Sequence, residues 1–234
     1  MSLTIVVVLV GIVIIGALAT MGWIKNREKV LRQRQSQLKL LMQRYRELEP
    51  LLQFILKTDN QPDVARALNR EMLDLTREMS KLDAHNADVA ALQEACVSRE
   101  SQLSMGTLVP GGETLIESDQ QLQRLQQVFN QITHKLQRMK LRNKLPAHEY
   151  EEMAAHLKGR LLHIQVESHK ALAERMLAEG QRRDAELHLK HARNALKRSA
   201  VDFEGKHDMI KGLSDQIKAL ERGETGATPE PDAT

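Results

Sequence analysis

The chain has 234 residues and a formal net charge of +3, which is room for one ordinary domain or two small ones plus an anchor. Charged residues make up 28% of the sequence and aromatic residues only 3%, a balance that suits long amphipathic helices better than a β-sandwich or an α/β enzyme. The single cysteine, Cys96, excludes a disulfide framework within one chain. Its helical spacing with Val89, Leu92 and Leu103 predicts a small core residue. We therefore expect an all-α protein.

Residues 1–24 are predicted to form a transmembrane anchor. No charged side chain occurs from Leu3 to Ile24, and about 22 helical residues, or about 33 Å, are enough to cross a hydrocarbon core of about 30 Å. A cleaved signal peptide needs basic residues before its apolar run, whereas here the basic residues follow it. The pattern therefore favours an anchor that is kept. The residues expected at the membrane interface are Trp23, Lys25, Arg27 and Lys29.

The charge distribution also predicts a topology. Because basic flanks stay in the cytoplasm, we expect a single pass with the N-terminus outside and residues from 25 onward in the cytoplasm. The expected location is a plasma membrane, such as the inner membrane of a bacterium. The expected partners are the lipid bilayer, further copies of the chain and other proteins of a membrane complex, which the sequence does not identify.

The anchor is expected to continue into a juxtamembrane helix over residues 25–57. Its apolar residues alternate steps of three and four, the pattern of a helix that pairs along its length. The segment 58–62 is predicted to end it, and a helical hairpin is predicted over 58–104, with helices at about 62–82 and 87–104. We call the apolar residues of the first helix the first seam: Leu38, Leu41, Tyr45, Leu48, Leu52 and Ile55.

A glycine- and proline-containing stretch, 105–117, is predicted to be a linker before a helical bundle over 118–221. We expect helices from a cap at Ser118 to about Asn143, then about 30 residues to Glu179, then 183–198 and a last short helix. Residues 222–234 are rich in Gly, Pro, Thr and acid, which predicts a disordered tail. The first helix of the bundle carries a second seam: Leu122, Leu125, Phe129, Ile132, Leu136 and Met139.

Residues 171–198 resemble one tetratricopeptide repeat. The similarity implies a helical hairpin that turns at Gly180, and in that family paired helices form grooves that hold peptides of other proteins. The residues that carry the resemblance are Ala171, Ala178, Gly180, Ala185, Ala192 and Ala195.

Histidines in the same region raise the question of a metal site. His188 and His191 share a helix face, and His169 could come near them if the helices 148–179 and 183–198 fold back on each other, with Glu167 or Glu186 in range. Three such ligands could hold zinc. The zinc motifs His-Glu-x-x-His and Cys-x-x-Cys are absent from the sequence, and histidines scattered through basic helices are usually solvated. The prediction is therefore that the chain holds neither a metal nor another cofactor.

The remaining chemistry favours binding over catalysis. Carboxylates are interleaved with lysines and arginines along the helices, as solvated ion pairs are, so we expect no enzyme and no catalytic residue. Two basic stretches, 134–144 and 190–198, could meet the phosphates of nucleic acid or of anionic lipid. Their candidate contacts are Lys135, Arg138, Lys140, Arg142, Lys144, Lys190, Arg193, Lys197 and Arg198.

The sequence thus predicts a single-pass, membrane-anchored helical scaffold or adaptor that assembles a membrane complex through helix–helix contacts. Copies of the chain are expected to pair through the first seam. The alternative is a membrane-tethered binder of nucleic acid or anionic lipid that uses the two basic stretches.

Overall fold

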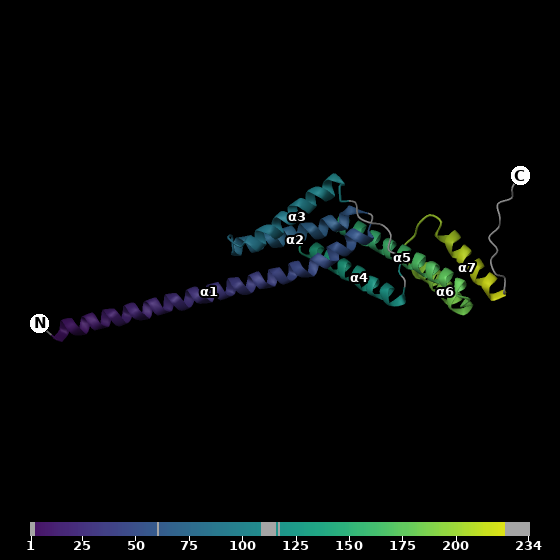
Figure 1. The fold of residues 1–234 in the computed structure, drawn as a ribbon. Coiled ribbons are helices and arrows are strands. Elements are labelled where there is room, and N and C mark those ends of the chain that lie inside the picture. The colour runs from purple at the N-terminus through teal and green to yellow at the C-terminus, as the bar shows by residue number, and fades with distance from the viewer. Residues whose placement is uncertain (1–2, 60, 109–115, 117, 223–234) are drawn as a thin grey trace. The chain divides into compact units, whose positions relative to one another are not determined.

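The computed structural model describes the backbone of residues 3–59, 61–108, 116 and 118–222, and the side chains of these ranges from residue 27 onward. Within these ranges the chain forms seven α-helices and no strand (Figure 1), which confirms the predicted all-α class and the helical-bundle architecture. The helices are α1 (Leu3–Thr58), α2 (Pro62–Leu82), α3 (Ala87–Met105), α4 (Asp119–Leu141), α5 (Ala147–Ala178), α6 (Arg182–Arg198) and α7 (Lys206–Arg222).

Several predictions fall on residues outside these ranges. Across the part of the chain that is described, no helix has a stretch long and apolar enough to cross a membrane. The side chains of the predicted anchor, residues 1–24, are not among those described, so the structure gives the anchor no support. Most of the predicted linker, 109–115 and 117, and the predicted tail from 223 onward also lie outside the described residues.

The chain divides into two compact units. The first unit comprises Met1–Pro50 and Asn69–Met105, and the second comprises Leu51–Leu68 and Gly106–Thr234. The boundary falls inside α1 and inside α2, so each of these helices contributes residues to both units.

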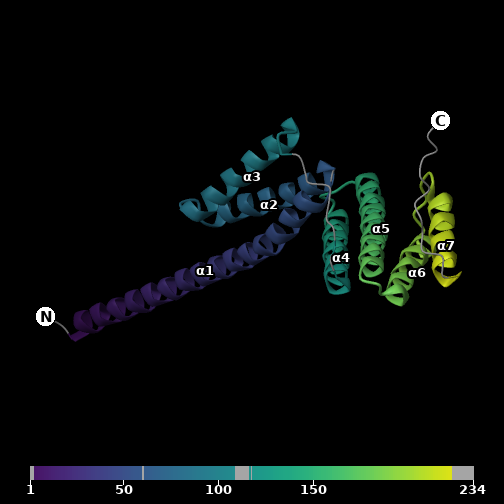
Figure 2. The same cartoon turned by 45° about the vertical axis from the view of Figure 1, so that its right-hand side comes forward.

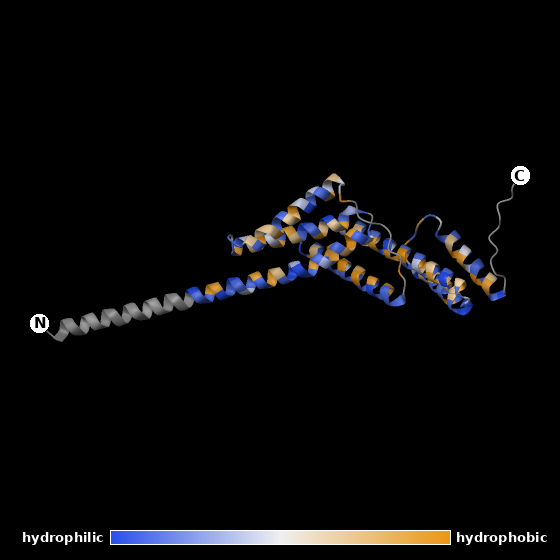
Figure 3. Ribbon diagram, in the orientation of Figure 1, coloured by the Kyte–Doolittle hydropathy of each residue, from blue (hydrophilic) through white to orange (hydrophobic). Residues whose placement is uncertain are grey.

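In the first unit, α3 bonds to both α1 and α2. The Tyr45 hydroxyl of α1 lies 3.7 Å from the Cys96 sulfur of α3, and Ser80 of α2 donates to the side chain of Gln93 of α3 at 3.1 Å. Hydrophobic residues alternate with hydrophilic ones along these helices (Figure 3), and the apolar faces are buried. The main buried side chains are Leu41, Leu48, Met72, Leu75, Met79, Val89, Cys96 and Leu103.

In the second unit, α4 packs on α5, α5 on α6, and α6 on α7 (Figure 2). The Ser118 side chain caps α4 by accepting a hydrogen bond from the backbone N–H of Gln121. Helix α4 ends where Asn143 takes a left-handed conformation with φ 56°, and the N–H of Lys144 then closes the turn on the Met139 carbonyl at 3.0 Å.

The turn between α5 and α6 explains the hairpin that the sequence indicated. Gly180 has φ 75°, a left-handed conformation that costs a glycine little. The N–H of Gln181 donates to the Met176 carbonyl at 2.7 Å, which completes the helix end. Helix α6 therefore runs back along α5, and the two helices share a buried core with α7: Leu162, Val166, Ala173, Ala185, Leu189, Ala192, Leu196, Leu213 and Ile217.

Two side chains of α5 hold the C-terminal end of α1 within the second unit. Arg160 donates to the Thr58 carbonyl at 2.9 Å, which satisfies one of the carbonyls that a helix end leaves without a partner. His156 Nε2 lies 2.6 Å from Oδ1 of Asp59, a carboxylate that is fully buried. This His–Asp pair therefore holds the end of α1 against α5.

Candidate functional site

Three imidazoles converge on one side of the α5–α6 hairpin. His169 comes from α5, while His188 and His191 come from α6. One nitrogen from each ring can be chosen so that the three lie within 4.8 Å of one another. The Nδ1 atoms of His169 and His188 are 3.3 Å apart, and the ring centres are separated by 5.5, 5.3 and 6.3 Å. The fold thus brings together the three histidines for which the sequence predicted no role.

The environment keeps His169 neutral. Burial, together with the neighbouring His191 and His188, lowers the pKa of His169 to about 4, although the Asp119 carboxylate acts in the opposite direction. A neutral imidazole offers one nitrogen as a lone-pair donor. The exposure rises across the group, because His169 is buried, His188 is half-buried and His191 is exposed. The imidazole of His169 is therefore held by packing, whereas the exposed imidazole of His191 has room to change its side-chain conformation.

The acidic neighbour of this cluster is not one that the sequence suggested. Glu167 pairs with Lys170 at 3.1 Å, and Glu186 pairs with Lys190, so both carboxylates are engaged by lysines of their own helices. Asp119, in the first turn of α4, is the acid whose charge reaches His169. Nothing in the sequence spacing links Asp119 to residues on α5, because the packing of α4 on α5 creates the proximity.

Both predicted seams are used inside a single chain. In the first seam, every member from Leu41 onward is buried, and Leu38 is half-buried. All six members of the second seam are buried, and Phe129 makes an edge-to-face contact with Phe54 at a ring separation of 5.6 Å. The buried part of each seam therefore already has neighbours and does not need a second copy to cover it.

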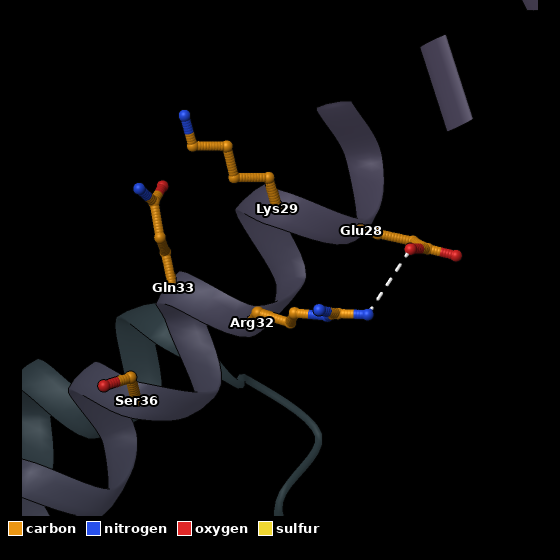
Figure 4. A pocket seen from close by; sticks show the side chains of 5 residues that line it. All are labelled: Glu28, Lys29, Arg32, Gln33 and Ser36. Atoms are coloured by element: carbon orange, nitrogen blue, oxygen red, sulfur yellow. Dashed lines mark ion pairs between the residues drawn. The ribbon is translucent and has the colours of Figure 1, made fainter. Parts of the chain in front are cut away.

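The stretch of α1 before the seam is different. Every residue from 27 to 40 is exposed except the half-buried Leu38, and this includes the predicted interface residues Arg27 and Lys29. Figure 4 shows a shallow hollow on this stretch, lined by Glu28, Lys29, Arg32, Gln33 and Ser36 of α1 alone. The only contact drawn there is the Glu28–Arg32 ion pair at 3.6 Å. A hollow with walls from one helix does not enclose a ligand.

Intramolecular contacts engage part of the predicted polyanion-binding residues. Lys140 pairs with Glu151 at 3.2 Å and lies 4.8 Å from the centre of the Tyr150 ring. Lys190 bonds to Glu186 and pairs with Glu221 at 3.1 Å, and these carboxylates raise its pKa. Lys135 and Arg193 are half-buried. Exposed members of the two stretches are Arg138, Arg142, Lys144, Lys197 and Arg198.

Two apolar hollows lie beside the hairpin that resembles a tetratricopeptide repeat. One, of about 200 Å³, includes Gly159, Val201 and Phe203 in its lining. The other, of about 230 Å³, includes Leu177 of α5 and Leu220 of α7. Both are smaller than the roughly 300–1,000 Å³ of ordinary ligand pockets, and α7 occupies one side of the hairpin.

No protein-family model matches this chain, and comparisons with curated proteins and with solved structures give no match either. The chemistry and placement of its own side chains therefore carry the functional inference.

Proposed function

We propose that the chain is a single-pass, membrane-anchored helical adaptor that holds proteins of a membrane complex through helix–helix contacts. The observation that supports it best is the continuity of α1, which runs from Leu3 to Thr58 without a break. The uncharged N-terminal segment and the helical units are thus joined by helix rather than by a loop. At 1.5 Å per residue, the exposed residues 27–40 make a spacer of about 20 Å.

The anchor itself is proposed from the sequence. The segment from Leu3 to Ile24 carries no charge and is followed by a basic run, the arrangement that keeps the following residues on the cytoplasmic side. In this proposal the spacer and both helical units lie in the cytoplasm, and a plasma membrane holds the chain.

Contact between copies of the chain is proposed to involve the spacer rather than the buried part of the first seam. Val30 and Leu31 are exposed and large, and helical spacing places them with the half-buried Leu38 on the face that Leu41 continues. Pairing of two copies along this face would bury apolar surface that the single chain leaves in water.

The anchor is tested by membrane fractionation of the full chain and of a chain that lacks residues 1–24. The full chain should stay with the membrane after a high-salt and alkaline wash, and the shortened chain should be released. A shortened chain that remains in the washed membrane would contradict the anchor.

Pairing is tested by measuring the mass of the detergent-solubilised chain. The double substitution Leu31→Asp with Leu38→Asp should convert an oligomer to a monomer, because buried carboxylates in a helix pair are costly. Ser36→Asp is the matched control, since Ser36 is exposed on the opposite side of the same helix. A wild-type chain that is monomeric, or one whose mass ignores the double substitution, would remove homo-oligomeric pairing from the proposal.

Binding of nucleic acid or anionic lipid is the second candidate function, favoured by the exposure of Arg138, Lys197 and Arg198. Its test is the salt dependence of binding to duplex DNA and to vesicles with and without anionic lipid. Affinity should fall with salt, since phosphate contacts release counterions. Arg138→Ala should reduce that slope, and binding that salt does not weaken would contradict this function.

A further inference from the structure

We propose that His169, His188 and His191 form a binding site for a divalent transition-metal cation of the zinc class, which ties α5 to α6. This site is independent of the adaptor function and lies within the second unit.

The separation of two of the nitrogens matches metal coordination. Zinc binds histidine nitrogen at about 2.0–2.1 Å in tetrahedral geometry, so two ligand nitrogens on one ion lie about 3.3 Å apart. The Nδ1 atoms of His169 and His188 are 3.3 Å apart. A hydrogen bond between the two rings is the competing explanation, but it leaves the approach of the third ring unexplained.

The third imidazole can complete the set by a small movement. Its ligand nitrogen lies within 4.8 Å of the other two, and the His191 side chain is exposed, so rotation about its side-chain bonds meets little packing. The two partners are positioned by the fold, because His169 is buried in α5 and His188 is on the facing turn of α6.

Charge in the cluster favours a cation. The Asp119 carboxylate of α4 is close enough to act electrostatically on His169. A carboxylate beside three nitrogen donors stabilises a bound divalent cation by charge attraction.

The donor set selects the class of metal. Imidazole nitrogen suits zinc, copper, iron and nickel, whereas magnesium and calcium require oxygen ligands. The single cysteine, Cys96, is buried in the first unit and contributes no thiolate here. Three protein ligands leave the fourth tetrahedral position for water.

A metal at this place would act on the hairpin. His169 precedes Gly180 on α5, and His188 and His191 follow it on α6, so one ion would cross-link the two helices on either side of their turn. Because the unfolded chain does not hold the three rings together, binding energy becomes folding energy of the hairpin.

The test uses the full chain without an affinity tag, in detergent, stripped with a chelator and then dialysed. Zinc is titrated in competition with a chromophoric chelator, and cobalt is added separately because tetrahedral nitrogen coordination gives it a visible absorption band. We expect one ion per chain, and the cobalt band should disappear when zinc is added.

The variants are His188→Gln and His191→Gln, both on α6. His148→Gln is the control, because His148 is an exposed histidine at the start of α5, outside the cluster. Loss of a side chain that only orients a metal ligand costs about 10–100-fold in metal affinity. Loss of a ligand itself should therefore cost on the order of 100-fold or more. His191→Gln changes an exposed side chain and should keep the wild-type circular dichroism. A chain that binds no zinc saturably, or His191→Gln and His148→Gln chains that bind zinc equally tightly, would overturn the proposal.

Discussion

One polar cluster of the first unit and the histidine cluster of the second unit satisfy their side chains in different ways. In the first unit, the Asn69 amide donates to the Cys96 carbonyl at 2.9 Å and to Glu100 at 3.0 Å, and its oxygen accepts from Arg99 at 3.4 Å. Arg99 in turn pairs with Glu49 at 3.3 Å. Asn69 and Arg99 each meet partners of complementary polarity, and the group links α1, α2 and α3. We call these residues the Asn69 network.

The histidine cluster of the second unit consists of three rings of one kind, unlike the His156–Asp59 pair of the same unit. His169, His188 and His191 present lone pairs and N–H groups to one another, and no member is a strong complementary partner for the other two. A buried polar group that serves the fold is normally closed by its own partners. A cluster of like nitrogen donors around one buried ring is matched best by a bound cation. The difference separates a structural network from a binding site.

Phe129→Ala gives the largest expected effect, because the second unit should depend on its apolar core and not on its histidines. Phe129 is almost fully buried and meets Phe54 edge to face. Removing such a ring costs about 3–5 kcal/mol. The free energy of unfolding is measured by urea titration of the full chain in detergent.

Phe203→Ala is the control for this substitution, because the side chain is 39% exposed and should cost no more than about 1 kcal/mol. Equal losses in the two variants would mean that the second seam does not form the core of its unit.

Zinc should stabilise only one of the two units. A ligand at 100 times its dissociation constant stabilises the folded state by about 2.7 kcal/mol, which should slow amide hydrogen exchange in α5 and α6. The amides of α3 should exchange at an unchanged rate, because the three histidines lie on α5 and α6 of the second unit. Uniform slowing across both units would contradict the contrast between them.

Asn69→Ala tests the Asn69 network of the first unit. The substitution removes the side-chain donor to the Cys96 carbonyl and to Glu100, and leaves Arg99 without one acceptor; a buried polar group that loses its partner costs about 1–3 kcal/mol. Arg70→Ala is the control, since Arg70 reaches the same Glu100 from the surface, at 3.4 Å and with 64% of its side chain exposed. Surface pairs contribute about 0–1 kcal/mol. Urea titration of both variants should therefore separate them.

Periodicity and capping residues were sufficient to predict most of the helices. The sequence placed a helix at 62–82, which is the range of α2, and Gly180 as the turn between two long helices. Ser118 was predicted as a cap and its side chain bonds to the Gln121 N–H. These features are local, because each depends on residues within a turn or two of one another.

Contacts between distant parts of the chain were harder to predict. From the sequence, His169 could approach His188 and His191 if the two helices fold back on each other. No local pattern favours this arrangement over three separate, solvated imidazoles. The electrostatic effect of Asp119 on His169 and the hydrogen bonds of the Asn69 network both depend on packing between helices. The spacing of residues in the sequence therefore does not predict either of them. The seams were identified as pairing surfaces, but their alternating pattern does not distinguish a neighbour in the same chain from a second copy.

Tyr45→Phe is expected to have the smallest effect. The Tyr45 hydroxyl is buried and lies 3.7 Å from the Cys96 sulfur, a weak acceptor. Burial raises the pKa of both groups, so both are neutral and their interaction is not charge-assisted. Removing the hydroxyl loses a weak hydrogen bond and also avoids the cost of burying a polar group, so the unfolding free energy should change by no more than about 0.5 kcal/mol.

Cys96 supplies a second measurement on the same pair. Since the thiol is buried and its pKa is raised, an aromatic disulfide reagent should modify it slowly in both the native and the Tyr45→Phe chain, and rapidly after unfolding. A decrease in unfolding free energy of more than about 1.5 kcal/mol in Tyr45→Phe would exceed the usual value of a neutral hydrogen bond. It would show that the Tyr45 hydroxyl belongs to the Asn69 network.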